Sequence, residues 1–425
     1  MIIKNFAQLA TSKLRRDALQ IIEDGLNSIN TRKIIEKNVR LHKNGLLWVK
    51  DNWVDLKKYR RIYLIGIGKA AFASVRVLEG KLKDYITDGI VLDIYGAPLK
   101  KVKSMVGTHP HTTETNVSAT REIIGLLQSA QEEDLVLTVI TGGGSALLCS
   151  PYKMSCETKD SIAQALWNAG ATVQEMNTVR KHLSGIKGGH FAQLAYPAKV
   201  VSLIFSDVPG DNLSAIASGP TVLDPTTVQD AAKILAKYNV LKVCSLPNCD
   251  LQETPKDPMI FRRVVNVVVV NNKTPIAAME ETGRHLGYKV EIFSSEISGE
   301  AEAVAKELVL NSKPKTALLA AGETTVRVKG KGKGGRNQHL VLAALKYLRD
   351  GRIIVSVNSD GYDFTPHAGA IGDEYTLKKA ARKKLPPEKY LKNDDSFHFF
   401  EKVGDAIKTG ILGTNVADLM LVLSK

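Results

Sequence analysis

The chain has 425 residues, more than one hydrophobic core usually organises, so its length predicts two domains. Hydrophobic residues make up 44% of the chain and charged residues 24%, which excludes a disordered, fibrous or membrane-embedded protein. The formal net charge of +14 suits nucleic acid, a membrane surface or small anionic substrates, and charge alone does not choose among them.

The N-terminus and the cysteines indicate the compartment. The apolar stretch in MIIKNFAQLATSKLRRD is too short for a signal peptide, and no segment approaches the roughly 20 apolar residues that span a bilayer. The cysteines form no CxxC pair, and their spacing suits neither a zinc site nor a disulfide framework. We therefore expect a cytoplasmic protein without a membrane partner, with reduced thiols at Cys149, Cys156, Cys244 and Cys249.

The first hundred residues predict helices followed by a βαβ unit. Apolar residues recur at four-residue spacing from Leu14 to Leu26, which predicts an amphipathic helix. Residues 60–80 then form a predicted strand, glycine turn and helix, and residues 89–96 the next strand. This order is typical of an α/β domain.

The strand-and-turn pattern recurs at residues 134–151 and again at 199–211. Each predicted strand ends in Gly, Ser or Asp residues. Because the carboxyl ends of parallel strands share the sheet edge where open α/β folds bind ligands, we expect the site of the first domain there.

A segment rich in proline and polar residues, 246–260, lacks periodicity and predicts a domain boundary. A second series of predicted strands and helices then runs to the C-terminus. The expected fold is α/β, with two Rossmann-like domains, mainly parallel sheets and an interdomain cleft. We expect the domains to be residues 1–250 and 260–425.

The first glycine turn, GIGKAA, follows a predicted strand and precedes a helix, where backbone amides can bind phosphate. Gly66 and Gly68 are the candidate phosphate-binding glycines, and Lys69 adds a cation that suits a phosphoryl group. Two alternatives stay open: a dinucleotide site with Asp93 on the ribose, or a simple tight turn.

The second glycine turn, TGGGSALL, holds three consecutive glycines, Gly142, Gly143 and Gly144. Such a run lets a ligand approach the backbone closely. Ser145 follows as a helix cap. The chain lacks the G-x-S-x-G elbow here, so an anion site is favoured over a serine nucleophile.

Basic residues gather around a Gly-Gly pair in MNTVRKHLSGIKGGHFA, residues 176–192. A carboxylate or phosphate partner would explain the cluster, whereas a glycine pair does not suit the interior of a solvated helix. His182 is given no ligand role. The basic members are Arg180, Lys181, His182, Lys187 and His190.

Asp207 and Asp211 lie four residues apart at the end of a predicted strand. Carboxylates suit Mg²⁺, which usually takes one or two of them together with phosphate oxygens. Aspartates that cap turns are the alternative interpretation.

The second domain carries a candidate phosphate-binding segment at residues 321–345. Glu323 stands at a predicted strand end, a Gly/Lys run follows, and Arg336 and Asn337 open a helix. The run predicts either a flexible phosphate-binding loop or a mobile hairpin, and Arg336 could neutralise a transferring phosphoryl group.

Together these motifs resemble the glycerate 2-kinase family, whose C-terminal half is known as the MOFRL domain and whose members were often labelled hydroxypyruvate reductases. Their common order over nearly the whole chain makes coincidence implausible. The blocks are GIGKAA (66–71), GTHPHTTETNVSAT (107–120), TGGGSALL (141–148), NTVRKHLSGIKGG (177–189), SDVPGDNLSAIASGPT (206–221), GETTVRVKGKGKGGRNQ (322–338) and GTNVADL (413–419).

The resemblance implies transfer of phosphate from ATP, with Mg²⁺, to the 2-hydroxyl of D-glycerate, giving 2-phosphoglycerate. It also implies a homodimer, and no nucleic-acid partner is expected. The family pattern makes Lys69, Asp207, Asp211 and Arg336 candidate catalytic residues, with the two aspartates as candidate metal ligands.

The remaining candidate residues are assigned to the two substrates. We place the glycerate carboxylate against Ser145, Arg180 and Lys187 as a hypothesis. The candidate nucleotide- and phosphate-binding residues are Gly66, Gly68, Gly142, Gly143, Gly144, Glu323, Asn337 and Asp360.

One block departs from the family pattern. The family commonly shows Asp-Gly-x-Asp-Gly-Pro-Thr-Asp in a late strand-end loop, whereas residues 360–367 read DGYDFTPH. Asp360 and Asp363 are retained. The roles of residues 364–367 are therefore not carried over from the family.

Two other functions compete with a kinase. The first glycine turn and Asp93 would suit an NAD(P)-dependent hydroxypyruvate reductase, and the net charge a nucleic-acid-binding module. The chain has neither the G-x-x-x-x-G-K-[ST] motif nor protein-kinase signatures, so the kinase interpretation depends on the family resemblance.

Overall fold

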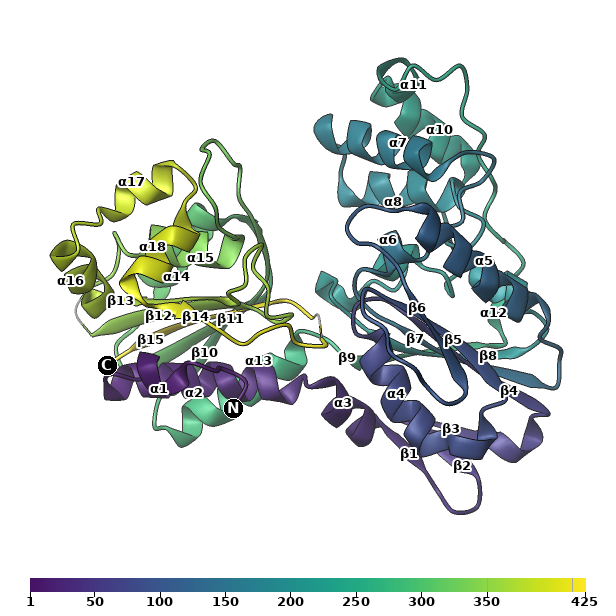
Figure 1. The fold of residues 1–425 in the computed structure, drawn as a ribbon, viewed down its shortest axis with the longest axis horizontal. Helices are drawn as coiled ribbons and strands as arrows, with labels where there is room; N and C mark the ends of the chain where they lie inside the picture. Colours follow the sequence, from purple (N-terminus) through teal and green to yellow (C-terminus); the bar gives the residue numbers. More distant parts are fainter. Residues whose placement is uncertain (350, 415) are drawn as a thin grey trace. The chain divides into compact units, whose positions relative to one another are not determined.

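The structure is a computed structural model of a mixed α/β protein (Figure 1). The chain divides into two compact units, each with its own six-stranded sheet. One unit is Thr31–Val269, and the other combines Met1–Asn30 with Val270–Lys425. The structure describes residues 1–349, 351–414 and 416–425.

The first thirty residues pack with the C-terminal half of the chain, unlike the range 1–250 expected for the first domain. Helix α2 (Lys13–Ser28) lies along one face of the C-terminal sheet, where Leu19, Ile22 and Leu26 are buried (Figure 1). This docking joins segments far apart in sequence, which no local pattern encodes.

A buried network of ion pairs holds α2 against the C-terminal part of the chain. The Arg15 guanidinium donates from Nε to Asp373 Oδ2 at 2.8 Å and from Nη1 to Asp405 Oδ1 at 2.7 Å. Arg15 is 1% exposed and Asp405 is fully buried. Each charge depends on its partners, because an unpaired buried ion is costly.

The sheet of the Thr31–Val269 unit has the strand order β6-β5-β4-β7-β8-β9. The pairs from β6 to β8 are all parallel, as predicted for this domain. All seven residues of β7 are buried, as expected for a strand covered on both faces. The strands are β4 (Arg61–Ile67), β5 (Asp88–Asp93), β6 (Val102–Val106), β7 (Asp134–Ile140), β8 (Lys199–Phe205) and β9 (Val264–Val270).

Three strand ends meet at the carboxyl edge of this sheet. Ile67 is paired with Ile140, and Ile140 with Ile204, so β4, β7 and β8 end side by side. β4 leads through a turn into α4 (Ala71–Leu82), and β7 into α6 (Gly144–Leu147). The predicted convergence of the glycine turns is thereby confirmed.

The helices of this unit form two groups. α5 (Glu114–Gln128) and α9 (His190–Ala195) contribute to the core on one sheet face. A second group has its own apolar core and lies beyond the sheet in Figure 1. Its members are α7 (Cys156–Asn168), α8 (Val173–His182), α10 (Val228–Lys237) and α11 (Val240–Val243).

A small antiparallel sheet and two short helices complete the unit. The sheet follows α3, which packs on α4. These elements are α3 (Thr31–Asn38), β1 (Val39–Leu41), β2 (Leu46–Val49), β3 (Asn52–Asp55) and α12 (Pro258–Phe261), with the 3₁₀ turns η3 (Pro209–Asp211) and η4 (Ile216–Ser218) after β8.

The sheet of the second unit is mixed, so the prediction of mainly parallel sheets is wrong here. Its order is β10-β11-β15-β12-β13-β14, and β10–β11 is the parallel neighbour pair, whereas β15 runs antiparallel to both β11 and β12. The final strand inserts between earlier ones, which local patterning does not reveal. The strands are β10 (Lys289–Glu300), β11 (Thr316–Thr325), β12 (Arg352–Asn358), β13 (Gly369–Asp373), β14 (Ala406–Ile407) and β15 (Asp418–Ser424).

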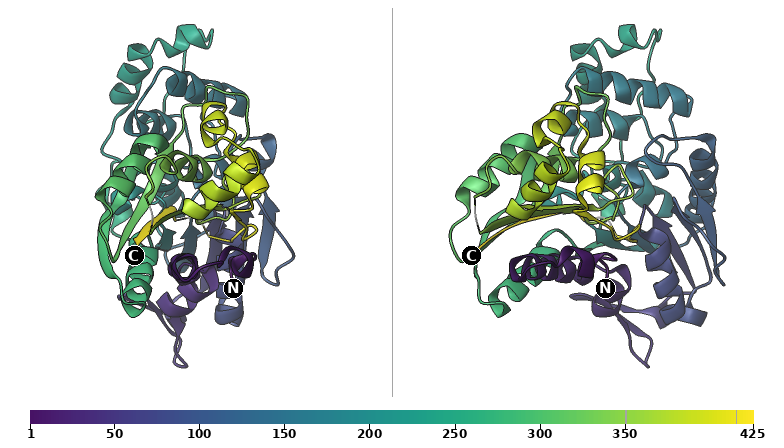
Figure 2. Two further views of the ribbon diagram at one scale, coloured as in Figure 1. Left: turned by 90° about the vertical axis from the view of Figure 1, so that its left-hand side faces the viewer. Right: turned by 60° about the vertical axis from the view of Figure 1, so that its left-hand side comes forward.

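Alternate residues of the central strands build two separate cores. Leu319 and Leu421 belong to the core shared with α2 and α13, and Leu318 and Val422 to the core of α14 and α15. Figure 2 shows helices on both faces of this sheet. The helices are α1 (Phe6–Leu9), α13 (Lys273–His285), α14 (Ala301–Asn311), α15 (Arg336–Ala344), α16 (Glu374–Arg382), α17 (Pro387–Lys392) and α18 (Ser396–Val403).

Candidate active site

Lys69 lies in the turn after β4, beside the glycine run that follows β7. Its backbone nitrogen donates to the Gly142 carbonyl at 2.9 Å. Gly68 has φ +117°, and a Cβ there would lie 2.2 Å from Thr141 Oγ1. Glycine is therefore required at position 68, because the two turns touch through their backbones.

Gly66 allows α4 and the neighbouring strand to pack closely against β4. It lies within β4, where a Cβ would come 2.6 Å from Val75 and 2.8 Å from Val91. Its missing side chain lets α4 approach the sheet closely. This observation supports the structural interpretation of Gly66 over a contact with phosphate.

The dinucleotide alternative needs the Asp93 carboxylate to bind a ribose, but this carboxylate is hydrogen-bonded within the protein. Its carboxylate accepts from the backbone nitrogen of Phe72 at 2.9 Å and of Ile94 at 2.6 Å. Burial raises the pKa of Asp93 to about 6, although these backbone bonds oppose the shift. The side chain, 2% exposed, anchors the start of α4.

The glycine run after β7 is covered by protein groups. Gly143 has φ +80°, and a Cβ there would lie 2.9 Å from Lys69 Cγ and 3.2 Å from His109 Cδ2. A Cβ at Gly144 would lie 2.8 Å from that of Ala217. The run therefore brings the Lys69 side chain, the 107–120 block and the segment after β8 against one turn.

His109 lies beside Lys69 and is exposed. Partial desolvation, and then the positive charge of Lys69, lowers the pKa of His109. The sequence of the 107–120 block had indicated no chemical role for it.

Ser145 links the glycine run to the segment after β8. Its hydroxyl oxygen lies 3.1 Å from Ser218 Oγ, and Ser218 in turn donates to Asn177 Oδ1 at 3.1 Å. Sequence reasoning missed Ser218 and Asn177 as members of this site. The signal that could have found them is their position in the motif blocks: Asn177 lies in NTVRKHLSGIKGG and Ser218 in SDVPGDNLSAIASGPT.

Lys187 is a buried cation next to Ser145. Its Nζ donates to the Ser145 carbonyl at 2.5 Å, and the residue is 2% exposed. Burial lowers the pKa of Lys187 to about 7, with further lowering by Lys159 and Arg180. Lys159 donates to Cys149 Sγ at 3.1 Å, so a second ammonium stands nearby.

Arg180 is the least satisfied cation of the group. Among the described residues its guanidinium has no hydrogen bond and no ion pair within 4 Å. Burial lowers the pKa of Arg180, and a longer-range attraction to Asp160 only partly opposes this. The residue is partly exposed, so water reaches its guanidinium, and an anionic ligand could take the place of that water.

The other basic residues of this block have partners within the chain. Lys181 bonds Ser214 and pairs with Asp224 at 3.1 Å. His182 contacts the Thr178 carbonyl at 2.8 Å, which agrees with giving it no ligand role. His190 Nδ1 lies 2.7 Å from the Lys187 carbonyl.

Asp207 and Asp211 follow β8 and are partly exposed. Asp211 has φ +55°, and its backbone nitrogen donates to the Val208 carbonyl at 3.1 Å. These carboxylates stand at the carboxyl edge of the sheet, as expected. Their role as metal ligands stays a prediction.

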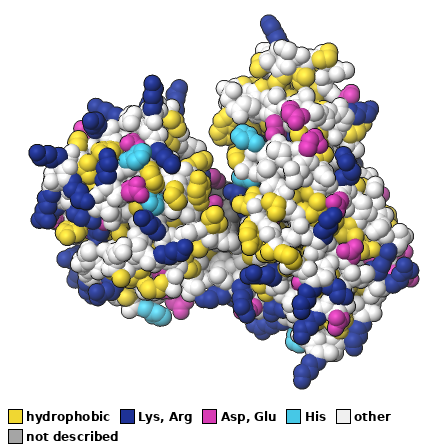
Figure 3. Space-filling model, in the orientation of Figure 1, with side chains coloured by type: hydrophobic (Ala, Val, Ile, Leu, Met, Phe, Trp, Pro, Cys, Tyr) yellow, Lys and Arg dark blue, Asp and Glu magenta, His cyan; other side chains and the backbone are white. Residues whose placement is uncertain are grey.

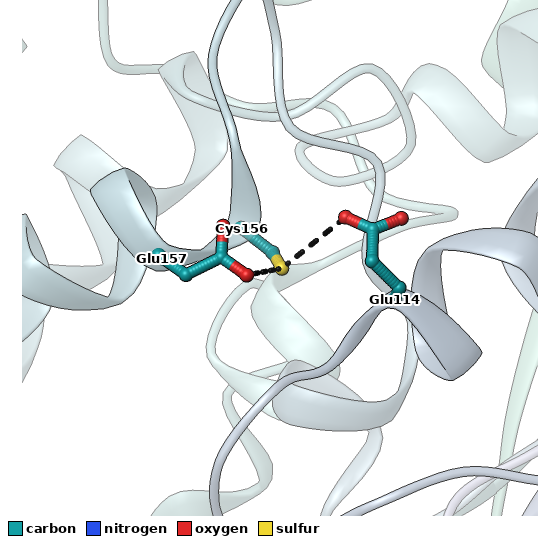
Figure 4. A group of neighbouring side chains, drawn as sticks. All are labelled: Glu114, Cys156 and Glu157. Carbon is teal, nitrogen blue, oxygen red and sulfur yellow. Dashed lines mark hydrogen bonds between the residues drawn. The ribbon is translucent and has the colours of Figure 1, made fainter.

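Three other side chains, those of Glu114, Cys156 and Glu157, lie close enough together to bind one metal ion (Figure 4). Cys156 Sγ lies 3.3 Å from Glu157 Oε1 and 3.6 Å from Glu114 Oε1. Burial and the two carboxylates raise the pKa of Cys156 to about 11, so the thiol keeps its proton near neutral pH. A thiol must lose that proton to bind a metal, so the group is best explained as a hydrogen-bonded cluster.

Arg336, in the second unit, is engaged by two carboxylates. Its Nε donates to Asp418 Oδ2 at 2.5 Å, and Nη1 pairs with Glu323 Oε1 at 2.6 Å. Burial alone would lower the pKa of Arg336, but the two carboxylates raise it. Asp418 is fully buried, whereas the Glu323 side chain is 61% exposed.

Asn337 and Asp363 form the start of α15. Asp363 Oδ1 accepts from the Asn337 backbone nitrogen at 3.1 Å and from its side-chain amide at 3.2 Å. Both residues are fully buried. Asp360 lies nearby in the 360–367 loop, where its Oδ1 accepts from the Tyr362 nitrogen at 2.8 Å.

The Gly/Lys run is tied down by a neighbouring turn. Backbone nitrogens of Lys329 and Gly330 donate to Asp394 Oδ2 at 2.7 and 2.6 Å, and that of Lys333 to Asp395 Oδ1 at 3.0 Å. These amides are therefore occupied, whereas the lysine side chains are exposed.

The predicted site residues thus fall into two groups, one in each unit. The first unit brings together the two glycine turns, Lys69, Ser145 and Lys187, with Arg180 on the adjoining helix. The second unit brings Glu323 to Arg336. Asn415 of the GTNVADL block lies outside the described residues.

Comparisons with known proteins cover nearly the whole chain. Residues 17–247 match a domain of unknown function, DUF4147, and residues 316–418 match the MOFRL family. D-glycerate 2-kinase from Thermotoga maritima is 38% identical over 382 residues, covering 85% of this chain and 90% of the relative. The chain belongs to the glycerate 2-kinase family.

Other members of the glycerate 2-kinase family agree with this assignment. Glycerate 2-kinase from Pyrococcus horikoshii is 33% identical, covering 96% of this chain and 97% of the relative. The crystal structure of glycerate kinase from Thermotoga maritima has a TM-score of 0.83 and 33% identity, covering 97% of this chain and 100% of that one. A relative from Agrobacterium vitis, 36% identical with 85% of this chain and 87% of its own length covered, carries the hydroxypyruvate reductase name within the same family.

Proposed function

We propose that this chain is a glycerate 2-kinase, which transfers the γ-phosphate of ATP to the 2-hydroxyl of D-glycerate. The observation that carries the proposal is a pair of cations in the basic block: Lys187, which donates to the Ser145 carbonyl of the glycine run, and Arg180, whose guanidinium has no acceptor among the described residues. Such a pair favours a small anion. Membership of the family makes glycerate the expected anion.

The glycerate carboxylate would sit against Arg180 and Lys187. Lys187 is buried, which strengthens its attraction for an anion relative to a solvated cation. On ligand binding, Ser145 would turn its hydroxyl proton from Ser218 to the carboxylate. This placement would leave the 2-hydroxyl directed away from the cationic end of the site.

Lys69 and the glycine turns would receive the phosphates. The glycines at 68, 143 and 144 let protein groups pack against the turns, and the Lys69 side chain lies over Gly143. Gly142 would contribute its backbone to phosphate binding. A loose phosphoryl transition state places negative charge on the equatorial oxygens, which a positioned ammonium stabilises.

The chemical step is a direct transfer. The 2-hydroxyl oxygen bonds to the γ-phosphorus as the bond to the bridging oxygen of ADP breaks, and we assign the released proton to Asp211. Asp207 and Asp211 provide the hard oxygen donors that Mg²⁺ prefers, and Asp207 would keep hold of the ion in the step in which Asp211 takes the proton. When bound, Mg²⁺ would neutralise charge on the phosphate oxygens.

The second unit has candidate nucleotide-binding residues of its own. Arg336 could reach a phosphoryl group by exchanging the exposed Glu323 while keeping the buried Asp418. Asp360, in the neighbouring loop, would also contact the nucleotide. Asn337 would act by holding the start of α15, since its side chain is fully buried.

The expected partners are small molecules and a second copy of the chain. In the described ranges no helix is long and apolar enough to span a membrane. Figure 3 shows lysine and arginine side chains spread over both units on the face that it presents. A homodimer, a cytoplasmic location and the absence of a nucleic-acid partner are parts of the proposal.

A coupled assay tests the function. Purified protein with D-glycerate, ATP and Mg²⁺ should release ADP only when all three are present. Hydroxypyruvate with NADH or NADPH should give no loss of absorbance at the cofactor band. Cofactor oxidation without ADP release would replace the kinase by the reductase alternative.

A further inference from the structure

A series of hydrogen bonds links Lys187 and Ser145, which are proposed to bind the carboxylate, to Asn177, which has no assigned role. Lys187 contacts the Ser145 carbonyl, Ser145 contacts Ser218, and Ser218 contacts Asn177. Asn177 and Arg180 both lie on α8, three residues apart, which places them on one helix face. Arg180 is thus carried by the same helix as Asn177, at the end of the series that begins with Lys187.

The orientation of the Asn177 amide is set by its hydrogen bond to Ser218. Ser218 donates its hydroxyl proton to Asn177 Oδ1 at 3.1 Å, so Oδ1 faces Ser218 and the amide nitrogen points elsewhere. Ser145, 3.1 Å from Ser218 Oγ, must then donate to Ser218. The protons therefore run from Ser145 through Ser218 to Asn177.

The Asn177 amide nitrogen has no hydrogen-bond acceptor among the described residues, and it is accessible to solvent although the residue as a whole is 8% exposed. A ligand that covered this N–H would have to accept its hydrogen bond, because a buried donor without a partner is costly. The same helix face carries Arg180, the guanidinium that also lacks an acceptor.

The backbone that carries Ser218 is held in an unfavourable conformation. Ala217 has φ +50° and Ser218 φ +60°, both in the left-handed region that non-glycine residues rarely adopt. Ser218 is fully buried. Strain of this kind persists where the surrounding structure fixes a functional geometry.

We propose that Asn177 is a substrate-binding residue, whose side-chain N–H donates to the carboxylate of the 2-hydroxy acid alongside Arg180, and that Ser218 is the positioning residue that orients it. The proposal deepens the proposed function and rests on it for the identity of the acid. Two neighbouring donors on one helix face suit the two oxygens of a planar carboxylate.

Calorimetric binding of D-glycerate, with and without ADP, tests the proposal directly. N177A should weaken D-glycerate binding by about tenfold or more, since it removes a hydrogen bond to a charged group. N177D should weaken it further, because a carboxylate would face the carboxylate of the ligand. N168A, at an exposed asparagine on α7, is the matched control and should bind as the wild type does.

A double-mutant cycle tests the role of Ser218. S218A should weaken binding less than N177A, and S218A/N177A should bind no more weakly than N177A alone, because Ser218 acts through Asn177. Additive losses would overturn the positioning role. Circular dichroism and thermal unfolding of each variant check that the fold is retained.

The outcomes separate this proposal from the kinase assignment. Unchanged binding in folded N177A and N177D would overturn the role of Asn177, whatever the wild type catalyses. Wild-type binding that depends on Asn177, without ADP release from ATP, would overturn the kinase and leave the role of Asn177 supported. Failure of the wild type to bind D-glycerate would overturn both.

Discussion

The ammonium of Lys187 lies 2.5 Å from the carbonyl oxygen of Ser145, at a position where Lys187 is 2% exposed. Burial first, and then the charges of Lys159 and Arg180, lowers the pKa of Lys187 to about 7. The side chain therefore changes charge near neutral pH. A carboxylate ligand binds the protonated form more tightly.

This pKa predicts how glycerate affinity depends on pH. Below about pH 7 Lys187 is charged and binding is strongest, and as the pH rises the charge is lost while the ligand stays ionised. The affinity should fall above pH 7 by up to about tenfold per unit. Calorimetry between pH 6 and 9 measures this, with K187M expected to bind weakly at every pH. A flat wild-type profile would contradict the account.

The Lys69 side chain should act in the chemical step. K69A removes the ammonium over the Gly143 turn and should reduce kcat by about a hundredfold or more, because charge stabilisation in the transition state is lost. Steady-state kinetics measures the loss. K101A, at an exposed lysine of the same unit, should keep near-normal turnover. Equal turnover of K69A and K101A would remove Lys69 from the catalytic group.

Two glycines of one unit should respond oppositely to alanine. G68A places a Cβ 2.2 Å from Thr141 Oγ1 at φ +117°, and should lower the free energy of unfolding by roughly 2–4 kcal/mol. G80A, in α4, meets nothing within 4 Å and should be neutral or stabilising by up to about 1 kcal/mol. Urea unfolding compares the two. A G68A protein as stable as G80A would mean that the turns do not touch as described.

The N-terminal helix should be essential to the C-terminal unit. R15M would leave Asp373 and Asp405 buried without their guanidinium and should cost about 3–5 kcal/mol. R16M, at the exposed neighbour, is the control. Denaturant unfolding followed with a probe in the C-terminal unit measures the effect. An unchanged midpoint for R15M would contradict the packing of α2 on that unit.

The local features of the site could be predicted from sequence, because they depend on strand ends and glycine turns. GIGKAA and TGGGSALL both lie at the predicted sheet edge, where Ile67 pairs with Ile140. The basic block also contains the two cations that the structure brings near one another, Arg180 and Lys187. Neighbouring residues in sequence, and the rule that parallel strands end at one sheet edge, were sufficient to predict the glycine turns and the basic block.

The remaining features depend on contacts between distant segments. Arg336 pairs with Asp418, 82 residues away, and Ser218 meets Asn177, 41 residues away. The strain at Ser218 is a backbone property that its residue type does not reveal. The insertion of β15 between β11 and β12 is likewise set by tertiary packing.

Identification of the product by phosphorus NMR tests the central claim most directly. With D-glycerate and ATP, the phosphate should be found on the 2-hydroxyl, as 2-phosphoglycerate, together with an equal amount of ADP. Recovery of 3-phosphoglycerate, or of ADP and inorganic phosphate with unmodified glycerate, would contradict the account.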